Sequence, residues 1–457
     1  MANSLYKNQE LLLTIKRVGI NGEGIGYYKK MAIFVDGALP GEDVVVSITE
    51  VHDQYSKAKM IRIKGKPSPY RVEPKCKYYG KCGGCNLQHV DYNYQLEMKK
   101  QIVVESFEKY YHKELNPKLF KDTIGMENPW FYRNKAKLPV RYDGERIVTG
   151  LYEENSNRLV YVDNCIIEKK EIRQAVKKIC EYLTRFQVIA YNPKTQEGVL
   201  RHIIVRHTSF KNKLQVTLVL YKEDTRTINI AKELLKIEDV VSVYYSINDD
   251  LDSLENFGRK VVHIAGERII QEKIGELKFD LLPTSFFQLN LEQTEKLYNQ
   301  VKNVGKFKGY EKVIDGYCGV GTIGLWVAGE VLEVRGIDNN VEAIKNANEN
   351  AKNNEINNAT FYNGNLLPHF HNYAKMGWTP DVLIVDPPRT GMDIKLINYL
   401  QEHPVAKILY ISCNPSTLAK NCNHLSSKYH ILSVQPLDMF PQTSHVECVV
   451  CLKRSQN

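Results

Sequence analysis

The strongest constraint on the fold is a regular alternation of short apolar runs and helical stretches that starts near residue 280. Val313–Asp315 is a β-type run, and the pattern Gly319-x-Gly321-x-x-Gly324 follows it and opens a helical stretch. Glycines at such a turn let the backbone approach a ligand closely. Because strands that alternate with helices form parallel sheets, we expect a C-terminal α/β domain of the Rossmann-like type.

Two acidic residues follow further predicted strands of this domain. Asp338 closes the run Val334–Ile337, about 20 residues after the glycine pattern, where an acid accepts hydrogen bonds from ribose hydroxyls. Asp386 closes a second apolar run and begins the sequence Asp-Pro-Pro-Arg389. The pattern predicts a nucleotide-type cofactor, and by itself it leaves NAD and S-adenosylmethionine open.

A cysteine and a glutamate stand at the ends of two more predicted strands. Cys413 follows the apolar run Ile408–Ile411, at the carboxyl end of a strand, where open α/β sheets bind their ligands. A single free cysteine is usually a small buried apolar residue, so Cys413 needs a chemical partner to be a nucleophile. Glu447 begins the apolar run near the end of the chain and is costly to bury unpaired. It is a candidate base, with a salt-bridged glutamate as the alternative.

A second group of cysteines predicts a metal site. Cys76, Cys82 and Cys85 are close in sequence, two glycines separate the last two, and Cys165 is the best candidate for a fourth ligand. Zinc sites usually come as two short pairs, whereas iron–sulfur clusters accept three near ligands and a distant one. The spacing leaves iron–sulfur and zinc open.

The N-terminal part predicts a domain that holds nucleic acid. Residues 1–63 alternate short β-type runs with glycines, which is typical of a small β-barrel of the oligonucleotide-binding kind. Lys57–Lys81 contains nine Lys or Arg and one acid, with tyrosines between them, and Phe131–Lys137 and Arg201–His207 repeat this pattern more weakly. Such stretches neutralise phosphates and stack on bases, or they are ordinary solvated faces.

The length of 457 residues predicts several domains. We expect the barrel over 1–63, an α+β central domain that binds RNA and carries the metal cluster over 64–275, and the catalytic domain over 276–457. A predicted helical segment, 92–124, is expected in the central domain or packed on the catalytic one. Ten cysteines, no membrane-length apolar run and no secretory start predict a cytoplasmic protein that binds no membrane. No protein partner is inferred and a monomer is expected, although the sequence carries no signal for the oligomeric state.

One reaction needs all of these groups together. Carbon 5 of uracil is a weak nucleophile, and a thiolate that adds to carbon 6 turns it into an enolate carbon that can attack a sulfonium methyl group. The reaction requires a cysteine, a carboxylate base, a polar group at the uracil edge and S-adenosylmethionine. Cys413, Glu447, Asp386 and the glycine loop supply these four parts.

The chain resembles the RNA uracil-5 methyltransferase family, which is class I and S-adenosylmethionine-dependent. The motifs that carry the resemblance are Ser412-Cys-Asn-Pro-Ser-Thr417, Asp386-Pro-Pro-Arg389, Asp315-Gly-Tyr-Cys-Gly-Val-Gly321, Ser285-Phe-Phe-Gln-Leu-Asn290 and His445-Val-Glu447. The resemblance implies Cys413 as nucleophile and Glu447 as base. It also implies that the cofactor site is lined by Gln288, Tyr317, Asp338, Asn365 and Asp386.

The N-terminal part is similar to the branch of this family that acts on 23S ribosomal RNA. Gly24-Ile-Gly26, Ile33-Phe-Val35 and Gly37–Glu42 resemble a TRAM domain. In that branch four such cysteines carry a 4Fe–4S cluster, which implies the ligands Cys76, Cys82, Cys85 and Cys165. We expect the cluster to have a structural role.

Four other functions account for parts of the same pattern. Uracil-5 methylation of transfer RNA uses the same catalytic motifs, and a non-catalytic ribosome-assembly factor uses the same barrel and basic stretches. RNA cytosine methyltransferases place their nucleophilic cysteine directly after Asp-Pro-Pro, where this chain has Arg389. A dehydrogenase accounts for the glycine loop and leaves Cys413 unexplained.

Overall fold

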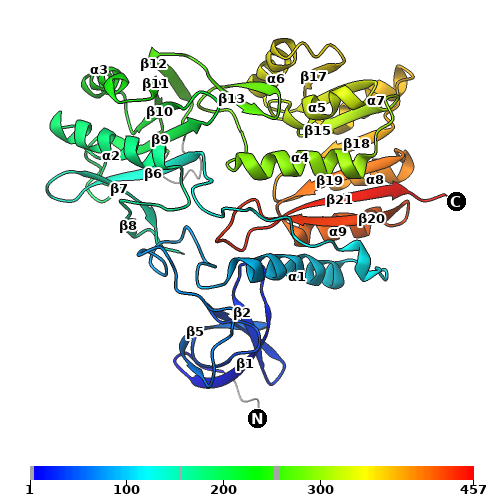
Figure 1. Ribbon diagram of the computed structural model, residues 1–457, viewed down its shortest axis with the longest axis horizontal. Coiled ribbons are helices and arrows are strands. Elements are labelled where there is room, and N and C mark those ends of the chain that lie inside the picture. The colour runs from blue at the N-terminus through cyan, green and yellow to red at the C-terminus, as the bar shows by residue number, and fades with distance from the viewer. Residues whose placement is uncertain (1–4, 155, 251–256, 457) are drawn as a thin grey trace.

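A computed structural model of the chain describes residues 5–154, 156–250 and 257–456. Figure 1 shows a small barrel at one end of the molecule and two larger sheets side by side at the other, with a long helix between the barrel and the C-terminal sheet. None of the helices in the described ranges is long and apolar enough to cross a membrane.

The N-terminal strands form a closed barrel in the order β1-β2-β3-β5-β4. Alternate residues of a strand face the barrel interior, and Val44, Val46 and Ile48 of β4 are therefore fully buried. The predicted small barrel is confirmed. Its strands are β1 (Glu10–Val18), β2 (Gly24–Tyr28), β3 (Met31–Asp36), β4 (Asp43–Val51) and β5 (Tyr55–Lys64).

The central domain is a seven-stranded sheet in the order β12-β11-β10-β9-β6-β7-β8, to which two helices, α2 (Lys170–Arg185) and α3 (Thr225–Lys232), contribute buried side chains. A 3-10 turn, η2 (Glu233–Lys236), extends α3. The strands are β6 (Lys135–Tyr142), β7 (Ile147–Tyr152), β8 (Leu159–Tyr161), β9 (Leu200–Thr208), β10 (Lys213–Leu220), β11 (Val240–Ile247) and β12 (Lys260–Gly266).

The interpretation of Arg201–His207 as a basic surface is wrong. These residues form most of β9, in the middle of the sheet, and the side chains of Arg201 and Arg206 are buried. Their guanidinium groups donate to main-chain carbonyls, that of Arg201 to Asn248 and that of Arg206 to Leu282. The two arginines therefore satisfy internal carbonyl groups and are not available to phosphates. Sequence alone did not reveal this because the basic residues stand in two pairs, Arg201-His202 and Arg206-His207, at the two ends of a short apolar run.

The predicted helical segment 92–124 is helical only in its first part. Helix α1 (Tyr92–Tyr110) begins at Asp91, whose side chain accepts hydrogen bonds from the first turn. It buries Met98 and Ile102 in the same apolar core as the C-terminal sheet. After the 3-10 turn η1 (Pro117–Leu119), the chain runs beside the last strands of that sheet. Although α1 precedes the central domain in sequence, it packs with the catalytic domain.

The C-terminal domain is a seven-stranded sheet in the order β17-β16-β15-β18-β19-β21-β20, with only β21 antiparallel to its neighbours. The strands are β15 (Lys312–Gly316), β16 (Glu333–Asp338), β17 (Ala359–Asn363), β18 (Val382–Val385), β19 (Lys407–Ser412), β20 (Tyr429–Leu437) and β21 (Glu447–Arg454). A two-stranded hairpin, β13 (Ile270–Ile274) and β14 (Leu277–Leu281), precedes this domain.

Helices cover both faces of this sheet. Along β19 the side chains alternate: Ile408 and Tyr410 enter the core with α1, α7, α8 and α9, while Leu409 and Ile411 enter the core with α4, α5 and α6. The helices are α4 (Leu291–Gly305), α5 (Thr322–Val327), α6 (Val341–Asn353), α7 (Leu366–Lys375), α8 (Ile394–Glu402) and α9 (Pro415–Leu425), and the turn η3 (Ala328–Glu330) extends α5. This confirms the predicted Rossmann-like domain.

Candidate active site

The candidate nucleophile lies in a tight strand-to-helix connection. Cys413 is the first residue after β19, and Asn414 caps α9 by accepting a hydrogen bond from Thr417 N at 3.3 Å. Pro415 occupies the first helical turn, where its missing N–H and preset φ suit a helix start. The proline that ends the strand in the sequence therefore also begins the helix. These contacts hold the half-buried thiol at the carboxyl edge of the sheet.

The candidate base lies on the neighbouring strand. β21 runs antiparallel to β19, and Ser412 pairs with Cys448. In an antiparallel pair the next position on one strand lies beside the preceding position on the other, so Cys413 and Glu447 are neighbours. Glu447 is 7% exposed. Antiparallel pairing across the sheet thus brings together two residues that are 34 positions apart in the chain.

Burial and like charges raise the pKa values of this group. The pKa of the Cys413 thiol rises to about 11, first through burial and then through the charge of Glu447. Burial, and then Asp386, raise the pKa of Glu447 to about 8, and burial raises the pKa of Asp386 to about 6. Near neutral pH the site holds a protonated thiol beside carboxyl groups that can take or release a proton, as general acid–base chemistry requires.

The positive charge of Arg389 also acts on this site, a role that the sequence analysis did not predict. Its guanidinium lies 3.3 Å from His445 Nδ1, and its main-chain carbonyl accepts a hydrogen bond from the side chain of Asn414. Its positive charge opposes the rise in the pKa values of Cys413 and Glu447. The signal that could have revealed it is its place three residues after Asp386, in the same turn.

The glycine turn and Asp338 form one cradle at the carboxyl ends of β15 and β16. The Asp338 carboxylate accepts hydrogen bonds from Gly319 N at 3.0 Å and from Asn340 N at 2.9 Å. Tyr317 has a φ of +62°, an uncommon conformation for a residue with a side chain, which is found mainly where the surroundings enforce it. At Gly321 an added Cβ would lie 2.7 Å from the ring of Phe361.

Asp315 lies beneath this cradle and is nearly inaccessible to solvent. One carboxylate oxygen accepts a hydrogen bond from Gly324 N at 2.8 Å, and the other has no partner among the described residues. Burial raises its pKa to about 8. An unpartnered buried acceptor costs free energy. This buried and unpartnered carboxyl oxygen fits a cradle that is completed by a polar group of a bound molecule, such as a nucleotide-type cofactor.

The two remaining predicted cofactor residues lie at the starts of two helices of the catalytic domain. Gln288 comes just before α4, and its main-chain carbonyl accepts a hydrogen bond from the Asn134 side chain of the central domain at 3.0 Å. Asn365 is exposed at the start of α7. The preceding residue, Gly364, donates a hydrogen bond to the Asp338 carbonyl at 2.9 Å. Asn365 therefore lies one residue from a direct contact with the cradle.

The four cysteines of the predicted metal site meet around one cavity. Cys76, Cys82, Cys85 and Cys165 line it together with Tyr79 and other residues. Burial raises the pKa of Cys85 and of Cys165 to about 12. In the described ranges, no three His, Cys, Asp or Glu side chains form a group that could hold a metal ion. Four thiol groups are a donor set that both zinc and iron–sulfur clusters accept, so the site is compatible with either.

Comparisons with known proteins agree with this architecture. Residues 373–455 match the family model of tRNA (uracil-5-)-methyltransferase, residues 4–61 match the TRAM domain, and residues 307–376 match a methyltransferase domain. A Bacillus cereus protein named as an RNA methyltransferase is 43% identical over 454 residues, which cover 99% of this chain and 98% of the relative. A Listeria innocua RNA methyltransferase is also 43% identical, with 99% of each chain covered.

A solved structure resembles nearly the whole chain. The tRNA (uracil-54, C5)-methyltransferase of Pyrococcus abyssi, in complex with S-adenosyl-L-homocysteine, superimposes with a TM-score of 0.76 and 27% identity. The match covers 97% of this chain and 100% of the other. On these grounds the chain belongs to the RNA methyltransferase family whose catalytic domain is of the uracil-5 type.

Proposed function

We propose that the protein transfers a methyl group from S-adenosylmethionine to carbon 5 of a uridine in 23S ribosomal RNA. The observation that carries this proposal is the placement of the Cys413 thiol beside the Glu447 carboxyl group at the carboxyl edge of the sheet. Asp386 and Arg389 complete the charged group around them.

In the proposed reaction the thiolate of Cys413 adds to carbon 6 of the uracil. Carbon 5 becomes nucleophilic and forms a bond to the methyl carbon of S-adenosylmethionine, whose bond to sulfur breaks. Glu447 then takes the proton from carbon 5, and the electrons of that C–H bond re-form the 5,6 double bond as the thiolate leaves. The raised pKa of Glu447, about 8, suits a group that must hold this proton.

The cofactor contacts are part of the proposal. Asp338 is assigned to the ribose hydroxyls, and Gln288, Tyr317, Asn365 and Asp386 to the other edges of S-adenosylmethionine and of the uracil. Support comes from the hydrogen bond that joins Asp338 to the glycine turn at Gly319. Further support comes from the P. abyssi enzyme, which was solved with the demethylated cofactor.

RNA that contains 5-fluorouridine at the target position tests the covalent mechanism. Fluorine at carbon 5 cannot be removed as a proton, so the enzyme should remain covalently attached and migrate as a protein–RNA adduct in denaturing gels. Cys413→Ala should form no adduct and should not methylate RNA. Cys180→Ala, a change of another half-buried cysteine in α2, is the control and should retain both properties. Full methylation by Cys413→Ala would refute the mechanism, and it would also be the result expected of a non-catalytic assembly factor.

We also propose that Cys76, Cys82, Cys85 and Cys165 hold a 4Fe–4S cluster. The cluster supports the fold of the segment that carries the first three of them, residues 76–86, which we call the cysteine loop. Support comes from their convergence on one cavity. Protein purified without oxygen should be brown and contain about four iron atoms and four sulfides per chain, as such a cluster requires. A colourless protein that contains zinc and no iron would contradict this assignment.

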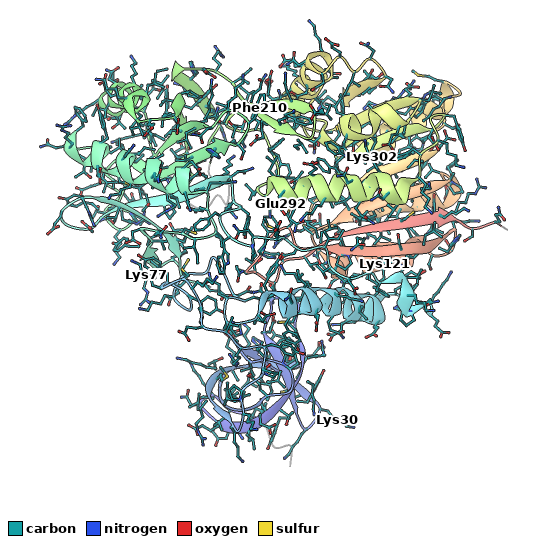
Figure 2. The ribbon with its side chains drawn as sticks, viewed as in Figure 1. Lys30, Lys77, Lys121, Phe210, Glu292 and Lys302 are labelled. Atoms are coloured by element: carbon teal, nitrogen blue, oxygen red, sulfur yellow. The ribbon has the colours of Figure 1, made fainter. Side chains whose placement is uncertain are left out.

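The proposal of a ribosomal substrate rests on the presence of both the TRAM barrel and the four cysteines. Further support for a large RNA comes from exposed lysines in separate parts of the chain: Lys30 on the barrel, Lys77 on the cysteine loop and Lys121 after α1 (Figure 2). Transfer RNA is the second candidate because the P. abyssi neighbour acts on it. Methylation assays on purified 23S rRNA and on tRNA, followed by mapping of 5-methyluridine, distinguish the two.

A further inference from the structure

The segment that leads into Glu447 is a nine-residue loop, Asp438–Val446, between β20 and β21. In Figure 1 this loop (red) extends away from its own sheet toward the centre of the molecule, where the barrel, the cysteine loop and the catalytic domain meet. Its conformation determines where Glu447 begins its strand. Contacts from other segments to this loop are therefore contacts that can position the proposed base.

Gln442, in the middle of the loop, has a strained backbone that other residues hold in place. Its φ is +70°, and it is 2% exposed. Its main-chain N–H donates to the Gln95 side-chain oxygen at 3.1 Å, and its own side-chain oxygen accepts a hydrogen bond from the same amide. Its carbonyl accepts hydrogen bonds from Asn86 N at 3.2 Å and Leu87 N at 3.0 Å. Residues held in a sparsely populated conformation persist only where the surroundings enforce it.

Asn86 makes hydrogen bonds through every polar group it has. Its side-chain oxygen accepts a hydrogen bond from Ser444 N at 2.9 Å, and its side-chain nitrogen donates to Ser444 Oγ at 3.2 Å and to the Asn21 carbonyl of the barrel at 2.5 Å. Its main-chain carbonyl accepts a hydrogen bond from Tyr79 OH, within the cysteine loop, at 2.8 Å. One residue therefore joins the barrel, the cysteine loop and the loop that carries the base.

We propose that Asn86 is a positioning residue for the methyl transfer, acting through Gln442 and Ser444 to hold Glu447 beside Cys413. This inference rests on the proposed role of Glu447. It assigns a function to Asn86, the residue directly after Cys85. A well-ordered cysteine loop fixes Gln442 and Ser444 through hydrogen bonds, and these two residues fix the start of the strand that carries Glu447. Because Asn86 also donates a hydrogen bond to the Asn21 carbonyl, the position of the barrel is part of the same connection.

Asn86→Ala tests the proposal, and Asn423→Ala is its matched control. Asn423 is also half-buried, and its side-chain oxygen accepts a hydrogen bond from His112 N at 2.9 Å, so it joins two distant segments away from the loop. In Asn86→Ala, hydrogen exchange measured by mass spectrometry should become at least about fivefold faster in the peptide 438–446, because the variant loses both side-chain hydrogen bonds to Ser444 and a typical net hydrogen bond already accounts for about that factor. Exchange in the peptide 313–327, at the cofactor cradle, should not change.

The kinetic readout separates positioning from binding. Asn86→Ala should lower the rate constant for methyl transfer at saturating RNA at least about tenfold, as small misplacements of catalytic groups do. Its dissociation constant for S-adenosylmethionine should stay within twofold of the wild-type value. The double variant Asn86→Ala/Ser444→Ala should be no slower than Asn86→Ala, because Ser444→Ala removes only a hydrogen bond that Asn86→Ala has already removed.

Two results would overturn the proposal. One is unchanged exchange in the peptide 438–446 of Asn86→Ala. The other is a loss of activity that Asn423→Ala shares to the same extent, since this would indicate general destabilisation. If Asn86→Ala shows the predicted change in exchange and the wild-type protein does not methylate uridine, the proposed function fails while the structural connection between Asn86 and the loop stands.

Discussion

Replacing Asp438 with asparagine removes the anion from an ion pair that is completely buried. Asp438 follows β20 and pairs with Lys99 of α1, and neither side chain is exposed. The ammonium group of Lys99 also donates to the Phe440 carbonyl at 3.2 Å, and Asp438 accepts a hydrogen bond from Tyr92 OH at 2.8 Å. Asparagine keeps the shape and one acceptor oxygen. The change therefore isolates the charge.

The expected loss of stability follows from this burial. Removing one partner of a buried pair leaves the other charge uncompensated, which costs about 3–5 kcal/mol. In a cooperative unit of about 200 residues, each kcal/mol shifts the melting temperature by about 2–4 °C. We therefore expect Asp438→Asn to melt at least about 6 °C below the wild type at pH 7, using the lower limits of both ranges.

The dependence on pH has a definite sign. Burial lowers the pKa of Lys99 below its ordinary value of 10.5, and Asp438 opposes this effect. In the variant that opposition is lost and the pKa falls further. Between the folded and the unfolded pKa the unfolded chain binds more protons, so this group's contribution to stability decreases as pH falls below 10.5. The deficit of the variant relative to wild type should therefore be large at pH 7 and shrink toward pH 10.

Thermal unfolding of both proteins at several pH values, followed by circular dichroism, measures the deficit. Glu342→Gln is the control because it removes the carboxylate of an exposed pair with Lys345, and its melting temperature should match that of the wild type. An Asp438→Asn protein that melts within 1 °C of wild type at pH 7, or a deficit that grows with pH, would refute the reasoning.

Three further predictions concern the two sites. Arg389→Met should move the rising limb of the pH–rate profile to higher pH, because Arg389 lowers the pKa of both the nucleophilic thiol and the catalytic base. An unchanged limb would contradict its electrostatic role. Gly321→Ala should weaken S-adenosylmethionine binding at least about tenfold in calorimetry and cost about 1 kcal/mol or more of stability, because its φ is +81° and the new Cβ meets the ring of Phe361. Gly309 has a similar φ and open space around it, so Gly309→Ala should lose stability through backbone strain and keep its affinity for S-adenosylmethionine. Cys165→Ser should lower the iron content of anaerobically purified protein and leave S-adenosylmethionine affinity unchanged, and full iron retention would exclude Cys165 as a ligand.

Local patterns carried most of what could be predicted. A glycine turn after an apolar run defines a strand, a turn and a helix within about 12 residues, and the structure has them as β15 and α5. The same holds for Cys413, since an apolar run followed by Asn-Pro encodes both the strand end and the helix cap. Predictions of this kind succeed because the interactions involved lie within one or two turns of the chain.

Predictions about surfaces and distant contacts were less successful. Arg201 and Arg206 looked like an RNA contact, and they are buried because β9 lies in the middle of its sheet. Helix α1 was not assigned to one domain, since its apolar face matches any complementary core. Sequence has no local signal for either property, because both depend on which elements become neighbours.

The sequence by itself determined the chemical groups of this protein and the strand ends on which they stand: a thiol, carboxylates, a glycine cradle and four further cysteines. Only the tertiary structure decided their environment. It placed Glu447 beside Cys413, raised their pKa values by burial, and joined Asn86 of the cysteine loop to the loop before the base. The physical reason is that burial, electrostatic potential and strand pairing depend on groups brought together from distant parts of the chain, whereas strand ends and turns depend on adjacent residues.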